Sequence, residues 1–159
     1  MNAYFAGECF WCITSVFAEH KGVIKVTSGY CGGLEINPTY QDVKAQKTGH
    51  RDTINVEYDE NIVSFEELLE IFINNVDLYD EGGQFIDRGN SYTLAIYYVD
   101  DKQKEVINQR FSKFDKPVCV SIEEFVEFYD AEEYYQDYYL KHPKEFEEEL
   151  ISSGRKQSK

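Results

Sequence analysis

Two cysteines separated by two residues, Cys9 and Cys12, are the side chains in this sequence best suited to chemistry. They stand where a short apolar stretch at residues 3–7 gives way to apolar residues at helical spacing. Because the amides and dipole at a helix N-terminus favour an anion, we expect the Cys9 thiol to have a lowered pKa, to be reachable from solvent and to act as a nucleophile. Cys12 lies one turn later, close enough for a disulfide. The pair predicts redox chemistry rather than simple packing of two small side chains.

Zinc binding is an alternative interpretation of the same pair, as in a small zinc-binding interaction module. A structural zinc site needs four ligands. The other candidate ligands are scattered along the chain, with no second close pair: Cys31, Cys119, His20, His50 and His142. We therefore expect no bound metal, and the redox interpretation needs no organic cofactor.

The composition limits the partners that the protein can have. The chain has 159 residues and a formal net charge of −14. Nucleic-acid binding depends on clustered Lys and Arg, so neither nucleic acid nor an anionic membrane is an expected partner. The first residues have no basic flank and reach Glu8 before an apolar run of signal length, and no segment is long enough to span a membrane. These features predict a cytoplasmic protein.

The spacing of apolar residues predicts the elements that must position the cysteines. Strands are expected at 3–7, 23–28, 53–58, 93–99 and 118–122. Helices are expected at 10–19, from a capping box at Ser64 to residue 76, at 102–114, and in an acidic, Tyr-rich region from residue 131. Two long loops, 34–51 and 80–90, lie between them, and such loops are often functional.

The fold class that follows is α+β, in a single domain. We expect this domain to cover residues 1–151 and to have a central mixed β-sheet wrapped by helices and long coil segments. A polar tail is expected at residues 152–159.

Several separated motifs resemble one known family. The block Gly7-Glu8-Cys9-Phe10-Trp11-Cys12 is similar to the Gly-Cys-Phe-Trp signature of the A family of peptide methionine sulfoxide reductases, in the subgroup with Cys after Trp. Further segments resemble the family in the same order: 29–33, 37–40, 47–50, 84–87 with Tyr92, and 131–139. The likeness spans residues 3–139, and several motifs at matching spacing are far more specific than one Cys-X-X-Cys.

The resemblance implies an activity and a role for each matching residue. The activity is reduction of methionine sulfoxide, free or in proteins and peptides, with a preference for the S epimer and a thioredoxin-like reductant. Cys9 would be the nucleophile and Cys12 the resolving cysteine. Phe10 and Trp11 would form the apolar wall that receives the methionine methyl group. The sulfoxide oxygen would be surrounded by Tyr40, Tyr92 and Asp52, with Asp87 as a nearby supporting acid.

These roles fit the chemistry of a sulfoxide, whose oxygen must be protonated or strongly hydrogen-bonded before a thiolate attacks sulfur. Tyrosine hydroxyls and a protonated carboxyl supply that. Asp52 can donate near neutral pH only if its pKa is raised, which an apolar aromatic pocket and the charge of Asp87 would both achieve. Oxygen transfer would leave Cys9 as a sulfenic acid, and Cys12 would condense with it to form a disulfide.

Three residues depart from the family pattern. Asp52 replaces the expected Glu, so a shorter side chain must reach the oxygen, and Tyr135 stands where His is usual. Glu8 stands where Gly is usual, and a carboxylate beside Cys9 disfavours the thiolate unless it points to solvent.

Other interpretations of the same residues remain open at this stage. Without the resemblance, the tyrosines and aromatic wall would be core packing, and the two aspartates solvated loop acids. Cys119 is expected to be buried and inert in a strand, whereas Cys31 is a possible second resolving thiol. A thioredoxin-like oxidoreductase also places Cys-X-X-Cys between a strand and a helix, but Pro117 lies too late in the chain for the proline that this fold needs.

Overall fold

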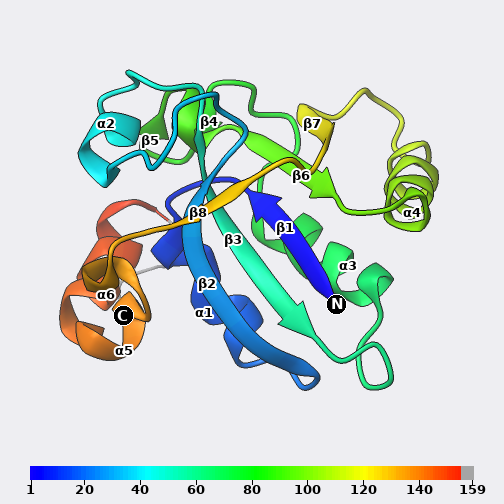
Figure 1. The fold of residues 1–159 in the computed structure, drawn as a ribbon, viewed down its shortest axis with the longest axis horizontal. Helices are drawn as coiled ribbons and strands as arrows, with labels where there is room; N and C mark the ends of the chain where they lie inside the picture. The colour runs from blue at the N-terminus through cyan, green and yellow to red at the C-terminus, as the bar shows by residue number, and fades with distance from the viewer. Residues whose placement is uncertain (155–159) are drawn as a thin grey trace.

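A computed structural model describes residues 1–154 and has a curled six-stranded sheet at its centre (Figure 1). The strands lie in the order β7-β6-β1-β3-β2-β8. Their bounds are β1 Asn2–Ala6, β2 Val23–Cys31, β3 Arg51–Tyr58, β6 Leu94–Tyr98, β7 Val120–Glu124 and β8 Phe128–Asp130. Neighbouring strands are antiparallel except β6 and β7, which are parallel. The predicted α+β fold with a mixed sheet is confirmed.

Three helices cover one face of the sheet: α1 Phe10–Ala18, α3 Phe65–Asn75 and α4 Asp101–Phe111. Alternate residues of a strand point to opposite faces, and Phe5 of β1 faces these helices. Its ring lies 5.2 Å, centroid to centroid, from Phe17 of α1 and 5.2 Å from Phe72 of α3. Tyr4, its neighbour, belongs to the smaller apolar cluster on the opposite face, which residues 125–128 cover.

Side chains cap the N-termini of α3 and α4 by hydrogen bonds to backbone amides. The Ser64 half of the predicted capping box at α3 is confirmed, since the Ser64 hydroxyl accepts a hydrogen bond from the Glu67 backbone N–H (3.1 Å). The Glu67 carboxylate lies 3.5 Å from the Ser64 hydroxyl instead of capping a backbone amide. At α4 the Asp100 carboxylate accepts in the same way from the Gln103 N–H (2.8 Å). None of the helices within residues 1–154 is both long enough and apolar enough to cross a bilayer.

The two predicted long loops contain short elements that periodicity did not indicate. The first holds helix α2, Tyr40–Lys44, and the second holds the two-stranded pair β4 Gly83–Gln84 and β5 Asp87–Arg88, followed by the 3-10 helix η1 Asn90–Tyr92. Strand β7 starts two residues later than expected, because the Cys119 N–H donates to the Leu78 carbonyl oxygen (2.6 Å) instead of to a strand. Cys119 is consequently partly exposed, and the prediction that it is buried is wrong.

The C-terminal region forms the 3-10 helix η2 Glu133–Tyr135 and helices α5 Tyr138–Lys141 and α6 Pro143–Ser152. They lie beside the N-terminal end of α1 (Figure 1). Gln136 fixes the segment to β2, since its side chain accepts from the Ser28 N–H (2.9 Å) and donates to the Ser28 carbonyl oxygen (2.8 Å). No residue of η2, α5 or α6 is fully buried. Of the predicted tail at 152–159, residues 155–159 lie outside the described part of the chain.

Candidate active site

Cys9 is the N-cap residue of α1, with φ −68° and ψ 129°, directly after the turn that leaves β1. Glu8 in this turn has a φ of 55°, in the left-handed region that favours glycine. Its backbone N–H donates to the Tyr92 carbonyl oxygen (3.3 Å), so the turn holds Cys9 beside the segment that carries Tyr92. The predicted strand, turn and helix around Cys9 are confirmed.

The Cys9 thiol differs from two expectations. Cys9 is only 3% exposed, so its sulfur is not open to solvent in this conformation. Burial raises the pKa of the thiol well above its ordinary value, and a hydrogen bond with Cys12 and the negative charges of Cys12, Asp52 and Asp87 act in the same direction. Desolvation and like charges thus outweigh the helix N-terminus. Cys9 is therefore a neutral thiol at rest, and it becomes a thiolate only if another group takes its proton.

Cys12 is the cysteine nearest to Cys9. The two Sγ atoms lie within 4.8 Å of each other, and Cys12 also lines a surface hollow of about 400 Å³. Cys31 lies in the cluster on the opposite face of the sheet, where its Sγ donates to the Glu127 carbonyl oxygen (3.1 Å). Cys119 is near Tyr79, whose carbonyl oxygen is 3.7 Å from its Sγ. A disulfide with Cys9 therefore requires the least movement from Cys12.

Asp52 lies on β3 and is 3% exposed. Burial raises the pKa of its carboxyl well above the usual range, and the charge of Asp87 raises it further, while a hydrogen bond from the Phe10 backbone lowers it. Within residues 1–154, Oδ2 has no hydrogen-bond partner. A carboxyl in this state is an available proton donor. The predicted upward pKa shift is thus confirmed, together with both of its expected causes.

Tyr40 and Tyr92 come from the two long loops and are 7% and 8% exposed. Tyr40 is the first residue of α2, whose N-cap Thr39 accepts from the Asp42 N–H (3.2 Å), and Tyr92 ends η1. Burial is the largest cause of the raised pKa of both phenols, and repulsion from Cys9 and Asp52 in their ionised forms acts in the same direction. Both hydroxyls therefore stay protonated and can donate hydrogen bonds at any physiological pH.

An aromatic cluster surrounds the start of α1. The Trp11 ring stacks on Tyr40, Tyr135 and Tyr138, with centroid separations of 5.7, 5.7 and 4.8 Å. Tyr40 and Tyr135 stack on each other at 4.1 Å, and Phe10, which is fully buried, is in contact with both. The predicted apolar wall of Phe10 and Trp11 is therefore part of a larger aromatic surface.

Some residues of the site were not predicted from the sequence. The Glu132 carboxylate accepts from the Tyr30 hydroxyl (2.9 Å) and from the Tyr40 backbone N–H (3.1 Å), so it fixes Tyr40. Tyr135, noted only as a departure from the family, stacks directly on Tyr40. The available sequence signal for Glu132 and Tyr135 is that both lie in the segment 131–139, which resembles the family but to which the resemblance assigned no roles. Glu149, which accepts from the Trp11 indole N–H (2.9 Å), lies beyond every recognised motif.

Two further acids border the site. Asp87 lies on β5, and its negative charge contributes to the raised pKa values of Cys9, Asp52 and Tyr92. It therefore lies near the reacting groups without being part of the buried cluster. Glu8 is 3% exposed, so its carboxylate does not point to solvent. A carboxylate buried beside Cys9 disfavours the thiolate.

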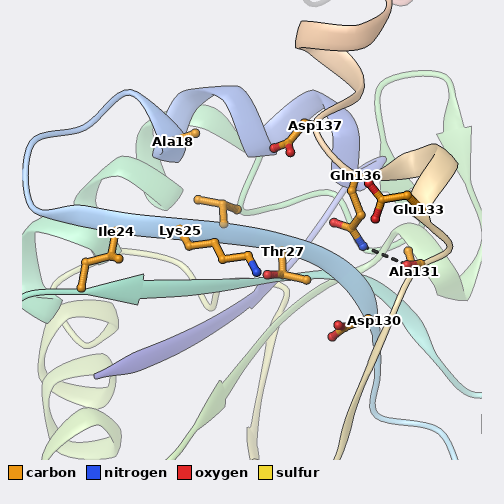
Figure 2. A pocket seen from close by; sticks show the side chains of 10 residues that line it. Ala18, Ile24, Lys25, Thr27, Asp130, Ala131, Glu133, Gln136 and Asp137 are labelled. Carbon is orange, nitrogen blue, oxygen red and sulfur yellow. Dashed lines mark hydrogen bonds between the residues drawn. The ribbon is translucent and has the colours of Figure 1, made fainter.

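A second hollow lies away from the thiols. Figure 2 shows this hollow of about 430 Å³ beside β2, lined by Lys25 and Thr27 of the strand and by Asp130, Gln136 and Asp137. The Gln136 amide donates there to the Ala131 carbonyl oxygen (2.9 Å). No cysteine lines this hollow.

Comparison with known proteins identifies the family. A family model described as peptide methionine sulfoxide reductase matches residues 1–159. The peptide methionine sulfoxide reductase MsrA of Bacillus licheniformis is 44% identical over 96% of this chain and 88% of its own length. The chain belongs to the peptide methionine sulfoxide reductase family. A thioredoxin-like oxidoreductase is therefore no longer an alternative.

Three solved structures share the fold. Methionine sulfoxide reductase A of Corynebacterium diphtheriae gives a TM-score of 0.82 at 26% identity, covering 89% of this chain and 74% of that one. Mxr1 of Saccharomyces cerevisiae in reduced form gives 0.82 at 23% identity, covering 91% and 86%. The same protein in complex with Trx2 gives 0.54 at 17% identity, covering 87% and 84%. At identities below 25%, the two yeast structures show the shared fold.

Proposed function

We propose that the protein repairs oxidised methionine by reducing the S epimer of methionine sulfoxide, free or in proteins and peptides, with Cys9 as nucleophile. The observation that carries the proposal is the position of Cys9 at the start of α1, within 4.8 Å of the Cys12 sulfur. The raised pKa of Asp52 and the protonated phenols of Tyr40 and Tyr92 supply proton donors beside it. The S epimer is taken from the family resemblance.

The first step transfers oxygen from the substrate to Cys9. Asp52 gives its proton to the sulfoxide oxygen while the Cys9 proton passes to Asp52, so the total charge of the site does not change. The Cys9 sulfur forms a bond to the substrate sulfur, and the oxygen then moves to Cys9. The products are the thioether of methionine and a Cys9 sulfenic acid. Hydrogen bonds from Tyr40 and Tyr92 stabilise the oxygen as it gains negative charge.

The second half of the cycle restores Cys9. The Cys12 sulfur attacks the sulfenic acid, a Cys9–Cys12 disulfide forms, and water leaves. A thioredoxin-like protein then reduces the disulfide and is itself oxidised. The solved complex of Mxr1 with Trx2 supports a protein donor of this kind. Free thiols and such a donor belong to a reducing compartment, so we place the enzyme in the cytoplasm.

Substrate binding uses the aromatic surface around α1. Phe10 and Trp11 receive the methyl group, and Asp87 supports the charge state of the acid. Because Cys9 is 3% exposed, the methionine side chain enters only when the covering segment moves. That segment is η2 to α6, which stacks on Trp11 through Tyr135 and Tyr138.

Separate single-cysteine variants test the assignment of the two thiols. Cys9→Ser is expected to abolish reduction of the S epimer of a peptide-linked methionine sulfoxide, with dithiothreitol as reductant. Cys12→Ser is expected to release one methionine per enzyme in a single turnover and to lose recycling by thioredoxin. Cys31→Ser is the matched control and keeps both activities, because Cys31 lies on the other face of the sheet. Methionine formation by Cys9→Ser would refute the assignment of Cys9 as the nucleophile.

A further inference from the structure

Three potential metal ligands from the two ends of the chain meet at the start of α1. The Sγ atoms of Cys9 and Cys12 and a carboxylate oxygen of Glu149 all lie within 4.8 Å of one another. No other group of three His, Cys, Asp or Glu side chains within residues 1–154 comes together in this way. The two cysteines are 3% and 4% exposed, so the site is almost closed to bulk water.

The arrangement is close to a zinc site. Zinc binds sulfur at about 2.3 Å and carboxylate oxygen at about 2.0–2.2 Å, so two sulfurs on one tetrahedral ion lie about 3.8 Å apart. The observed limit of 4.8 Å leaves a closure of at most about 1 Å, which rotation of the cysteine side chains can provide. Thiolate ligands select zinc over magnesium or calcium, which prefer oxygen. Three protein ligands leave one position for water.

The third ligand is held in place by the helix that covers the thiols. Glu149 lies on α6, and its Oε2 accepts a hydrogen bond of 2.9 Å from the Trp11 indole N–H. A hydrogen bond of this kind orients a ligating carboxylate and is a regular part of metal sites. Phe146 and Leu150 of the same helix line the hollow beside Cys12. Closure of α6 over α1 therefore assembles all three ligands.

We propose that the reduced protein binds one Zn²⁺ through Cys9, Cys12 and Glu149, and that the bound ion reversibly blocks Cys9. Binding of the ion displaces two thiol protons, and no electrons are transferred. A disulfide has no thiolate to offer, so two-electron oxidation of the cysteines expels the ion. Metal binding itself is independent of the proposed function, whereas inhibition rests on Cys9 as the nucleophile of that function.

The test uses the full-length reduced protein and Co²⁺, which occupies zinc sites and absorbs visible light. We expect one Co²⁺ per chain, with a sulfur-to-cobalt charge-transfer band and the visible bands of a tetrahedral ion. Zn²⁺ should displace the cobalt and remove both signals. Cys12→Ser should lose the charge-transfer intensity of one thiolate. Oxidation with diamide should prevent binding.

Glu149→Gln distinguishes this site from a simple dithiol. The change is expected to weaken Co²⁺ and Zn²⁺ binding at least tenfold. Glu148→Gln is the control, because Glu148 is an exposed neighbour on α6 and the change in net charge is the same. Equal affinity in Glu149→Gln and wild type, or a Co²⁺ spectrum without sulfur bands, would overturn the proposal. Sulfoxide reduction without added metal is measured separately, so failure of the proposed function is recognised independently of metal binding.

Discussion

Asp52 is the residue whose protonation state controls the proposed chemistry. Its pKa is raised by burial and by Asp87, so the carboxyl keeps its proton to a higher pH than an ordinary aspartate. We predict that kcat/KM falls as pH rises through this raised pKa, because the deprotonated carboxylate can no longer protonate the sulfoxide. Asp52→Asn should lower kcat/KM by about 10²–10⁴-fold and remove this fall, as measured in pH profiles of both proteins. The same alkaline fall in Asp52→Asn would assign it to another group.

The length of the same side chain gives a second prediction. Asp52 stands where the resembling family has Glu, and its Oδ2 has no hydrogen-bond partner within the described residues. We predict that Asp52→Glu keeps or raises kcat/KM, because the added methylene brings the carboxyl nearer to the substrate oxygen. Steady-state kinetics with Asp52→Asn as the matched control provide the measurement. Activity as low as that of Asp52→Asn would mean that the pocket has been reshaped around the shorter acid.

At the residue scale, the sequence predicts which residues form the site better than it predicts the burial and contacts of those residues. The cluster of Cys9, Cys12 and Asp52 follows from motifs, but the raised pKa of Cys9 depends on how completely the surrounding aromatic rings exclude water. That exclusion involves Tyr135 and Tyr138, more than 120 residues away along the chain. A helix N-terminus alone predicts the opposite shift, so the tertiary contacts determine its sign.

At the element scale, one N-cap position links local structure to activity. Thr39 caps α2 and thereby orients Tyr40, whereas Ser64 caps α3, which carries none of the proposed site residues. Loss of such a cap costs about 1 kcal/mol of stability. We predict that Thr39→Ala lowers kcat/KM by about threefold to tenfold, a moderate effect because Glu132 still holds the Tyr40 N–H.

Ser64→Ala is the control for that prediction. It should shift the urea unfolding midpoint by an amount that corresponds to about 1 kcal/mol and leave kcat/KM within twofold of wild type. If both alanine variants lost activity to the same extent, a general loss of stability rather than the position of Tyr40 would be the cause.

Elements with a clear period could be predicted, and short elements could not. Helix α3 follows from its apolar stripe and its Ser64 cap, and β1 and β3 are located to within two residues. Strand β8, three residues long, exists because it pairs with the end of β2, with Tyr30 opposite Tyr129. Such pairing depends on the folded chain rather than on local sequence. The same reason explains why β4 and β5 were expected to be loop.

At the scale of the whole molecule, stability is distributed unevenly between the core and the C-terminal segment. Phe5, Phe17 and Phe72 are fully buried and join the sheet to α1 and α3. The segment η2 to α6, by contrast, contains no fully buried residue. Segments with few buried contacts open at a lower free energy than the global unfolding free energy. The cover over Cys9 can therefore open while the sheet and α1 remain folded.

This difference predicts how fast Cys9 reacts in the resting enzyme. Tyr138 stacks on Trp11 at 4.8 Å, and loss of about 1 kcal/mol from this contact should raise the population of the open form about fivefold. We predict that Tyr138→Ala increases the iodoacetamide alkylation rate of Cys9 by that factor, measured by peptide mapping with mass spectrometry. Tyr79→Ala, at a half-exposed tyrosine whose backbone carbonyl oxygen is the atom near Cys119, is the control and should leave the rate unchanged. If Cys9 were instead alkylated only at urea concentrations that unfold the whole protein, the thiol would have no local route to solvent, and entry of substrate by movement of this segment would be excluded.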